Sequence, residues 1–275
     1  MLIFEITTLC SKGVWNYDQS LWYVVSRRVH CADLRRHASM APDQTPQIRE
    51  LELEARQVLD KVNVARKEGR GPLFVEFSGT PKAGKSTIIN SLRLFLARND
   101  FKVFVLTERA STCPIRDKQH PFFNVWTACA TLTQLLAAAQ AGRDDVVIMD
   151  RGLFDALVWM RWLQDKESLD SSQRVVIEGF LTLDLWINLI DLIFIMKVSP
   201  DEALKREFGG QVTRKFGSIM NPETIREFND ALERTVNANV PFKNMLEVDT
   251  TNEQPEETSY QVVRKTLRAL DSAFS

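Results

Sequence analysis

The sequence predicts an α/β protein with three layers: a parallel five-stranded sheet, helices on both faces of the sheet, and an N-terminal extension. Two observations carry this prediction. From about residue 71 onward, short apolar runs of strand length alternate with longer helical patterns, as is typical of a parallel sheet covered on both faces. The first apolar run, at residues 73–77, leads directly into a glycine-containing loop and then into a helical pattern.

Strands are expected at residues 73–77, 103–107, 146–149, 192–198 and 245–248. The helical patterns between and after them cover residues 86–97, 125–141, 154–164, 172–188, 200–208, 222–237 and 256–273. In open sheets of this kind, ligands bind at the carboxyl ends of the strands. Functional residues are therefore expected directly after each strand.

The chain is expected to divide into an extension, residues 1–70, and a main domain, residues 71–275. The extension begins with a β-like run at 2–8 and continues with an aromatic, partly basic segment. A helix is predicted at 47–67, because apolar residues recur three and four positions apart and form an amphipathic stripe. Two interpretations stay open: the stripe packs on the main domain, or it forms the seam of a homodimer.

Composition narrows the classes of protein. The chain has 275 residues, 44% of them hydrophobic, and a formal net charge of −1, so no global basic field favours a nucleic-acid partner. The four cysteines are widely spaced and form no C-x-x-C pair, which fits a reducing compartment. The N-terminus has no basic start typical of a signal peptide, and the longest apolar stretch is interrupted by charged residues. We expect a cytoplasmic protein without a membrane span.

The loop after the first strand matches the phosphate-binding pattern G-x-x-x-x-G-K-[ST]. Its residues are Gly79, Thr80, Pro81, Lys82, Ala83, Gly84, Lys85, Ser86 and Thr87. Such a loop points successive N–H groups at a phosphate, and the following helix presents its positive end to the same anion. Lys85 would reach the β- and γ-phosphates and Ser86 would bind Mg²⁺. An ordinary turn containing Gly and Pro is the alternative. The pattern predicts a P-loop NTPase fold that binds ATP and Mg²⁺.

Two other strand ends carry a carboxylate next to an arginine. Glu108 and Arg109 follow the second strand, and Asp150 and Arg151 follow the third. The acids could hold the metal or accept a proton, and the arginines could bind phosphate in a bidentate way; a structural salt bridge is the alternative for either pair. Asp150 is the expected second magnesium residue. Asp155, at the start of the next helix, could act on the acceptor or stabilise the first helical turn.

Aromatic residues and a basic segment complete the candidate site. Phe122, Phe123 and Trp126, with Asn124 beside them, suit recognition of a planar base, although core packing is the alternative for each aromatic. Trp159, Trp162 and Trp186 are interpreted as core residues. The segment 209–217 has glycines around basic residues and could be a mobile lid that brings Arg206 and Arg214 to the transferring phosphoryl group; a solvated loop is the alternative.

The order of these features resembles the thymidylate kinase and deoxynucleoside kinase group of P-loop kinases. The resemblance covers residues 72–275 and consists of the phosphate loop, T-E-R-A after the second strand, D-R after the third, V-S-P-D-E-A-L-K-R before the basic segment, and V-D-T-T-N before the last helix. It implies that Arg151 contacts the acceptor phosphate and that Asp150 lies near magnesium and acceptor. It also implies that Glu108 and Arg109 bind the acceptor, and that Phe122, Phe123 or Trp126 stacks on it.

The chain also departs from that group. Thymidylate kinases usually have R-E-P-G-G where this chain has Glu108-Arg109-Ala110, and an aromatic residue where this chain has Gly152. Thymidylate is therefore not carried over as the acceptor, and the first seventy or so residues have no counterpart in the group.

The hypothesis that follows is an ATP- and Mg²⁺-dependent kinase acting on a small acceptor, best described as a nucleoside or nucleoside monophosphate. Lys85, Asp150, Arg151, Glu108 and Arg214 are the catalytic candidates. The acceptor-binding candidates are Arg109, Phe122, Phe123, Trp126, Asp155 and Arg206. Two alternatives stay open: a regulatory ATPase whose N-terminal region binds a partner, and a kinase acting on a non-nucleotide.

Overall fold

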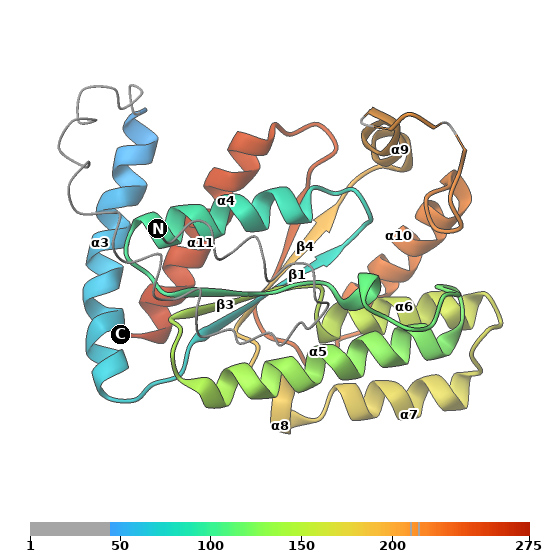
Figure 1. The fold of residues 1–275 in the computed structure, drawn as a ribbon, viewed down its shortest axis with the longest axis horizontal. Helices are drawn as coiled ribbons and strands as arrows, with labels where there is room; N and C mark the ends of the chain where they lie inside the picture. Colours follow the sequence, from blue (N-terminus) through green and yellow to red (C-terminus); the bar gives the residue numbers. More distant parts are fainter. Residues whose placement is uncertain (1–44, 210, 214) are drawn as a thin grey trace, which may run out of the picture. The chain divides into compact units, whose positions relative to one another are not determined.

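The structure is a computed structural model that describes residues 45–275 except residues 210 and 214. A parallel sheet of five strands in the order β2-β3-β1-β4-β5 forms its centre (Figure 1). This confirms the expected sheet. The expected β-like run at 2–8, the aromatic segment and the candidate lid residue Arg214 lie outside the described residues.

The strands end close to where the apolar runs predict. Their bounds are β1 Leu73–Gly79, β2 Val103–Leu106, β3 Val146–Asp150, β4 Leu192–Lys197 and β5 Met245–Asp249. Strand β1 is central, with Phe77 opposite Asp150 of β3 and Gly79 opposite Met196 of β4. The loop that follows β1 therefore begins between the carboxyl ends of its two neighbours.

The longer helices are α3 Pro46–Lys67, α4 Lys85–Arg98, α5 Pro121–Ala141, α6 Leu153–Asp165, α7 Ser171–Leu181, α9 Pro200–Gly209, α10 Pro222–Asn237 and α11 Pro255–Ala273. Two short segments, η1 Arg109–Ser111 and α8 Asp184–Ile187, complete the described helices. Helix α5 begins four residues earlier than expected, because Pro121 occupies its first turn and the His120 side chain accepts a hydrogen bond from the Phe122 N–H.

The single helix expected at 172–188 is two helices, α7 and α8. The chain becomes extended at Leu183, where ψ is 134°. This turn brings Trp186 back to the core, where its indole N–H donates to the carbonyl oxygen of Leu181 at 3.2 Å. Apolar periodicity did not reveal the break because both halves bury apolar residues.

Two hydrophobic cores lie on opposite faces of the sheet (Figure 1). Side chains alternate along each strand, so Phe74 faces one core while Val75 and Phe77 face the other. Helices α5, α6 and most of α10 cover the first face, and α3, α4 and α11 cover the second. The two cores account for the nearly continuous apolar sequence of the strands.

Helix α3 packs on the main domain. Its stripe Leu51, Ala55, Val58 and Val62 is buried in the same core as α4 and α11. Near its end, Arg66 donates two hydrogen bonds to the buried carboxylate of Asp145. The first of the two sequence interpretations therefore describes the helix, and this stripe is not left free for a second copy of the chain.

Within the described residues, α5 is the one helix long and apolar enough to cross a membrane by length and composition. This is weak support for a span, because the core helix of a soluble protein passes the same test. Leu132, Leu135 and Ala138 of α5 pack in the first core.

Candidate active site

The phosphate loop has the backbone that its glycines allow. Gly79 has a φ of 117°, and a Cβ there would lie 2.1 Å from the carbonyl oxygen of Met196, so only glycine fits. The buried hydroxyl of Thr80 donates to Oδ1 of Asn229 in α10 at 2.7 Å, and its N–H donates to Met196 at 2.9 Å. The loop is thus fixed to β4 and α10 before helix α4 begins at Lys85.

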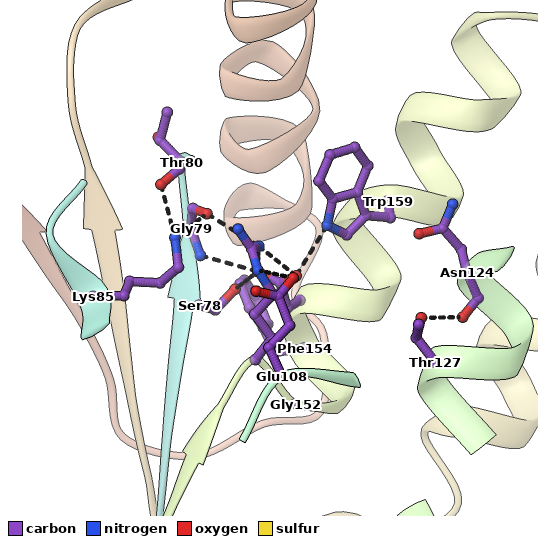
Figure 2. A network of polar contacts seen from close by, with 12 residues as sticks. Ser78, Gly79, Thr80, Lys85, Glu108, Asn124, Thr127, Gly152, Phe154 and Trp159 are labelled. Carbon is purple, nitrogen blue, oxygen red and sulfur yellow. Dashed lines mark hydrogen bonds and ion pairs between the residues drawn. The ribbon is translucent and has the colours of Figure 1, made fainter. Parts of the chain in front are cut away.

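Lys85 is buried behind the loop. Its ammonium group donates to the carbonyl oxygens of Gly79 at 3.0 Å and Thr80 at 2.8 Å (Figure 2). Burial, and secondarily the positive charge of Arg151, lower the pKa of Lys85 to about 7, although nearby carboxylates oppose the change. The charge of this lysine therefore depends on pH near neutrality.

Ser86, in the first turn of α4, lies next to Asp150, the last residue of β3. The Ser86 hydroxyl donates to Oδ2 of Asp150 at 3.2 Å. Hydroxyl and carboxylate oxygens are ligands that Mg²⁺ accepts when phosphate and water supply the rest. The two residues expected to share a metal site are therefore adjacent and chemically suited to it.

Arg151 lies between two acids. Its Nη1 is 2.9 and 2.8 Å from the carboxylate oxygens of Asp155, and its Nε is 3.0 Å from Oε1 of Glu108 without the alignment of a hydrogen bond. Burial would lower the pKa of Arg151, but the charges of Asp155 and Glu108 raise it overall. The backbone of Arg151 has a φ of 66°, a conformation rare for non-glycine residues, and its N–H donates to Phe77 in β1.

Asp155 is surrounded by hydrogen-bond donors. Its Oδ1 accepts from the Ser78 hydroxyl, the Gly79 N–H and Arg151, and its Oδ2 accepts from Arg151 and the indole N–H of Trp159 (Figure 2). Burial opposes the charged form, but Arg151 and Lys85 hold the pKa of Asp155 below its usual range. Asp155 thus joins α6 to the phosphate loop, and both of its oxygens are engaged by the protein.

Glu76 is a buried acid that the sequence analysis did not assign. It lies in β1, and its carboxylate accepts hydrogen bonds from the backbone N–H groups of Gly152, Phe154 and Asp155. Complete burial raises its pKa to about 8, with the N–H groups lowering it and the charge of Asp155 raising it. A carboxylate inside an otherwise apolar, buried strand was the signal that could have found it.

A cavity of about 710 Å³ connects these groups. Of the loop residues, Pro81, Lys82, Gly84, Lys85, Ser86 and Thr87 line it, together with Glu108, Arg109, Asp150, Arg151, Asp155 and Arg206. The lining also includes Lys118, Phe123, Asn124, Thr127, Thr131, Trp159, Ile219 and Met220, and Figure 2 shows Asn124 and Thr127 across the site from Lys85. Residues that follow three strands, β1, β2 and β3, thus share one space with residues of α5, α6 and α9.

The aromatic candidates are separated by the structure. Phe123 lines the cavity, whereas Phe122 is 68% exposed and lies in a separate hollow beside α7. Trp126 is half-buried and is not among the lining residues. Trp159, interpreted as a core residue, packs against the core and also lines the cavity.

Asn124 is 5% exposed, and its amide nitrogen has no hydrogen-bond partner within the described residues. It lies on α5 one helical turn before Thr127 (Figure 2). An unpartnered buried donor is costly, so a ligand with a matching acceptor would remove that cost.

Arg206 lies on the phosphate-loop side of the cavity. Its guanidinium donates to the carbonyl oxygen of Thr250 at 2.6 Å, to the Thr250 hydroxyl at 3.1 Å and to the carbonyl oxygen of Lys82 at 3.3 Å. The Thr250 hydroxyl in turn lies 3.1 Å from the carbonyl oxygen of Ala83. Arg206 thus braces the loop, and its expected place on the acceptor side stays a prediction.

The strand order, the phosphate loop and the cavity at the strand ends define the fold of a P-loop kinase. No family model matches the chain, and no curated protein matches it in sequence. Solved structures of deoxyadenosine kinase from M. mycoides do match. The structure with products dCMP and dCDP has a TM-score of 0.54 at 20% identity, over 72% of this chain and 100% of that chain. The structure with dATP has a TM-score of 0.55 at 20% identity, over 71% and 99%. The one with dCTP has a TM-score of 0.53 at 19% identity, over 72% and 100%. The similarity shows that this chain has the deoxynucleoside kinase fold.

Proposed function

We propose that this protein is an ATP- and Mg²⁺-dependent kinase that transfers the γ-phosphoryl group to a hydroxyl of a nucleoside. The observation that carries the proposal is the convergence of Lys85, the Ser86–Asp150 pair and Arg151 on one cavity whose other end holds Phe123 and Asn124. Lys85, Ser86 and Asp150 suit a triphosphate and its metal, Arg151 suits the acceptor side, and Phe123 and Asn124 suit a planar base. The similarity to deoxyadenosine kinase structures supports the same class of reaction.

On the donor side, the phosphate loop and Lys85 hold the triphosphate. The Lys85 ammonium exchanges its bonds to Gly79 and Thr80 for bonds to phosphate oxygens. Ser86 and Asp150 would hold Mg²⁺, which would neutralise charge on the phosphates. Arg206 keeps the loop in place through its contacts with Lys82 and Thr250.

On the acceptor side, the base lies between Phe123 and Trp159, both of which line the cavity. The free amide nitrogen of Asn124 donates to an acceptor atom on the edge of the base. Thr127 and Thr131 offer further polar groups in the same wall. The acceptor therefore has a planar, hydrogen-bonding end and a reactive hydroxyl near Arg151.

Glu108 is the residue that orients this hydroxyl. It lines the cavity, and its side chain is 44% exposed. Asp155, the other candidate, already accepts hydrogen bonds at both oxygens. Elimination thus favours Glu108 as the group that accepts the proton of the attacking hydroxyl.

The charge balance favours a nucleoside over a nucleoside monophosphate. Arg151 lies between Asp155 and Glu108, so its positive charge is already neutralised by carboxylates. A phosphate placed there would meet Glu108 and Asp150 as well as Arg151. A neutral hydroxyl does not incur that repulsion.

The test is transfer of labelled phosphate from ATP to panels of nucleosides, deoxynucleosides and nucleoside monophosphates. Transfer to nucleosides in preference to monophosphates is expected. A preference for monophosphates would overturn the assignment of the acceptor. ATP turnover that no acceptor stimulates would instead favour the regulatory ATPase, in which the N-terminal region binds a partner. The cytoplasmic location and the homodimer stay predictions.

A further inference from the structure

We propose that Glu76 is a positioning residue for phosphoryl transfer: its buried carboxyl group holds the start of α6, and thereby Arg151 and Asp155, in their working geometry. This inference rests on the proposed function, because it assigns a role within that same site. Glu76 is fully buried and is not among the cavity-lining residues, so it acts only through the groups that it holds.

The contacts of Glu76 are those of a helix cap supplied by a distant strand. Its Oε1 accepts from the N–H groups of Gly152 at 3.0 Å and Asp155 at 2.9 Å, and its Oε2 accepts from Phe154 at 3.3 Å. The first N–H groups of a helix have no partner within the helix. The residue at the N-cap of α6 is Gly152, which has no side chain to serve them. Glu76 performs this task from β1.

Glu76 also explains the glycine after the Asp150-Arg151 pair. A Cβ at Gly152 would lie 2.3 Å from both Cδ and Oε2 of Glu76. The φ of Gly152 is −133°, which other residues can adopt, so the requirement is for space and not for conformation. The aromatic residue common at this position in the resembling kinases has no room while Glu76 is present.

The position of Arg151 follows from this cap. Glu76 fixes the backbone of Asp155, and the Asp155 carboxylate binds Arg151, the Ser78 hydroxyl and the Gly79 N–H. Arg151 in turn lies against Glu108 at the acceptor side. A displacement of the start of α6 would therefore disturb both the phosphate loop and Arg151, because Asp155 binds them both. A displacement of about 1 Å between reacting groups can cost about 10²-fold in rate.

Two substitutions separate the hydrogen bonds from the bulk of the side chain. Glu76→Gln keeps one oxygen that can serve the two shorter bonds, to Gly152 and Asp155. Glu76→Met has a similar length and no acceptor oxygen. Glu247→Met in β5 is a control, because Glu247 is an exposed glutamate in the same sheet.

The experiment measures kcat, KM for ATP, KM for the acceptor, and melting temperature for each variant. Glu76→Met should lower kcat about 10²-fold with KM for ATP within about twofold, whereas Glu76→Gln should stay within about tenfold of the parent kcat. Glu247→Met should match the parent. A folded Glu76→Met protein with parental kcat would overturn the proposal.

A second test adds a side chain at Gly152, with and without the Glu76 carboxyl group. Gly152→Ala should lower kcat because its methyl group displaces the Glu76 carboxyl group. In a Glu76→Ala background, Gly152→Ala should cost little more, since the space is then free. Equal effects of Gly152→Ala in both backgrounds would contradict the proposal.

Hydrogen exchange separates this inference from the proposed function. The amides of Gly152, Phe154 and Asp155 should exchange more slowly in the parent than in Glu76→Met, whether or not any acceptor is phosphorylated. Absence of phosphoryl transfer in the parent would overturn the proposed function. Slow exchange of these amides in the parent would still show that Glu76 caps α6. Unchanged exchange in Glu76→Met would overturn the cap.

Discussion

The ammonium group of Lys85 donates a hydrogen bond of 2.8 Å to the carbonyl oxygen of Thr80. The lysine that we propose binds phosphate is thus held by the backbone of its own loop. In this position it is buried, and its pKa is lowered to about 7, first by that burial and then by Arg151. Binding of a triphosphate replaces carbonyl partners by anionic ones, which raises the pKa of Lys85 again.

The first prediction follows from that change. Above pH 7 Lys85 is increasingly deprotonated, so ATP must bind together with a proton. The apparent Kd for ATP should rise by up to about tenfold per pH unit above 7, because only the protonated fraction is competent. Calorimetry in buffers of different ionisation enthalpy should detect proton uptake at pH 8. Lys85→Met should lose transfer and show neither the uptake nor the pH dependence above 7.

Arg151→Met is the subject of the second prediction. Removing the guanidinium should lower kcat by about 10²-fold, because Arg151 holds Glu108 beside the attacking hydroxyl, while leaving ATP binding within about threefold. It also leaves the buried carboxylate of Asp155 unpaired, which should cost about 3–5 kcal/mol of stability.

The double variant Arg151→Met, Asp155→Asn separates these two effects. It removes both charges, so it should recover much of the lost melting temperature and none of the lost transfer. Full activity of either variant would refute the placement of Arg151 at the acceptor.

The third prediction contrasts two carboxylates near Arg151. Glu108→Gln should lower kcat about 10²-fold with an unchanged melting temperature, because Glu108 is partly exposed and lies at the reacting end. Asp155→Asn should lower the melting temperature, because its oxygens accept five hydrogen bonds from neighbouring groups. The reverse pattern, with loss of stability only in Glu108→Gln, would exchange the two roles.

Asp191, at the start of β4, gives a prediction about stability and pH. Its carboxylate accepts from the Phe74 N–H at 2.8 Å, and burial raises its pKa to about 6 despite that bond and Lys243. Because the folded pKa exceeds the unfolded value, its favourable contribution is complete below about pH 4 and is lost as pH rises through 6. Asp191→Asn should therefore be about 1–2 kcal/mol more stable than the parent at pH 8. Urea unfolding at pH 4 and pH 8 tests this, since the gain should vanish at the lower pH.

The fifth prediction concerns the attachment of α3. Arg66→Leu leaves Asp145 buried without its cation, and should cost about 2–4 kcal/mol in the free energy of unfolding. Lys61→Leu breaks an exposed ion pair with Asp271 and should cost less than about 1 kcal/mol. Chemical denaturation of both variants gives the comparison, and equal losses would show that burial of Asp145 does not decide the effect.

Much of the fold was predictable because its strands are apolar on both faces and are separated by amphipathic helices. The phosphate loop was predictable because the glycines and Lys85 occur at fixed spacing after a strand. Helix periodicity could not choose between Phe122 and Phe123, since neighbours on a helix point about 100° apart and either could have faced the cavity. The packing of α5 decides that orientation, because Phe123 is buried together with Asn124 and Ala128 whereas Phe122 is exposed.

The acids needed three-dimensional information for a different reason. Asp155 was recognised as a candidate, but its partners Ser78 and Gly79 lie in β1, and the sequence does not specify the contact between β1 and α6. The role of Thr250 in bracing the loop also depends on a contact between distant segments. Local sequence patterns therefore located the strand ends, whereas tertiary packing determines which partners each side chain has at those strand ends.

The close approach of Gly152 to the Glu76 carboxyl group has an evolutionary consequence. Neither position can change freely by itself, so a descendant that gains a side chain at 152 must first shorten the one at 76. In homologous sequences the two positions should covary, with glycine accompanying glutamate and bulkier residues accompanying small ones. That pairing would mark the proteins of this fold in which a side chain from a distant strand caps the start of α6.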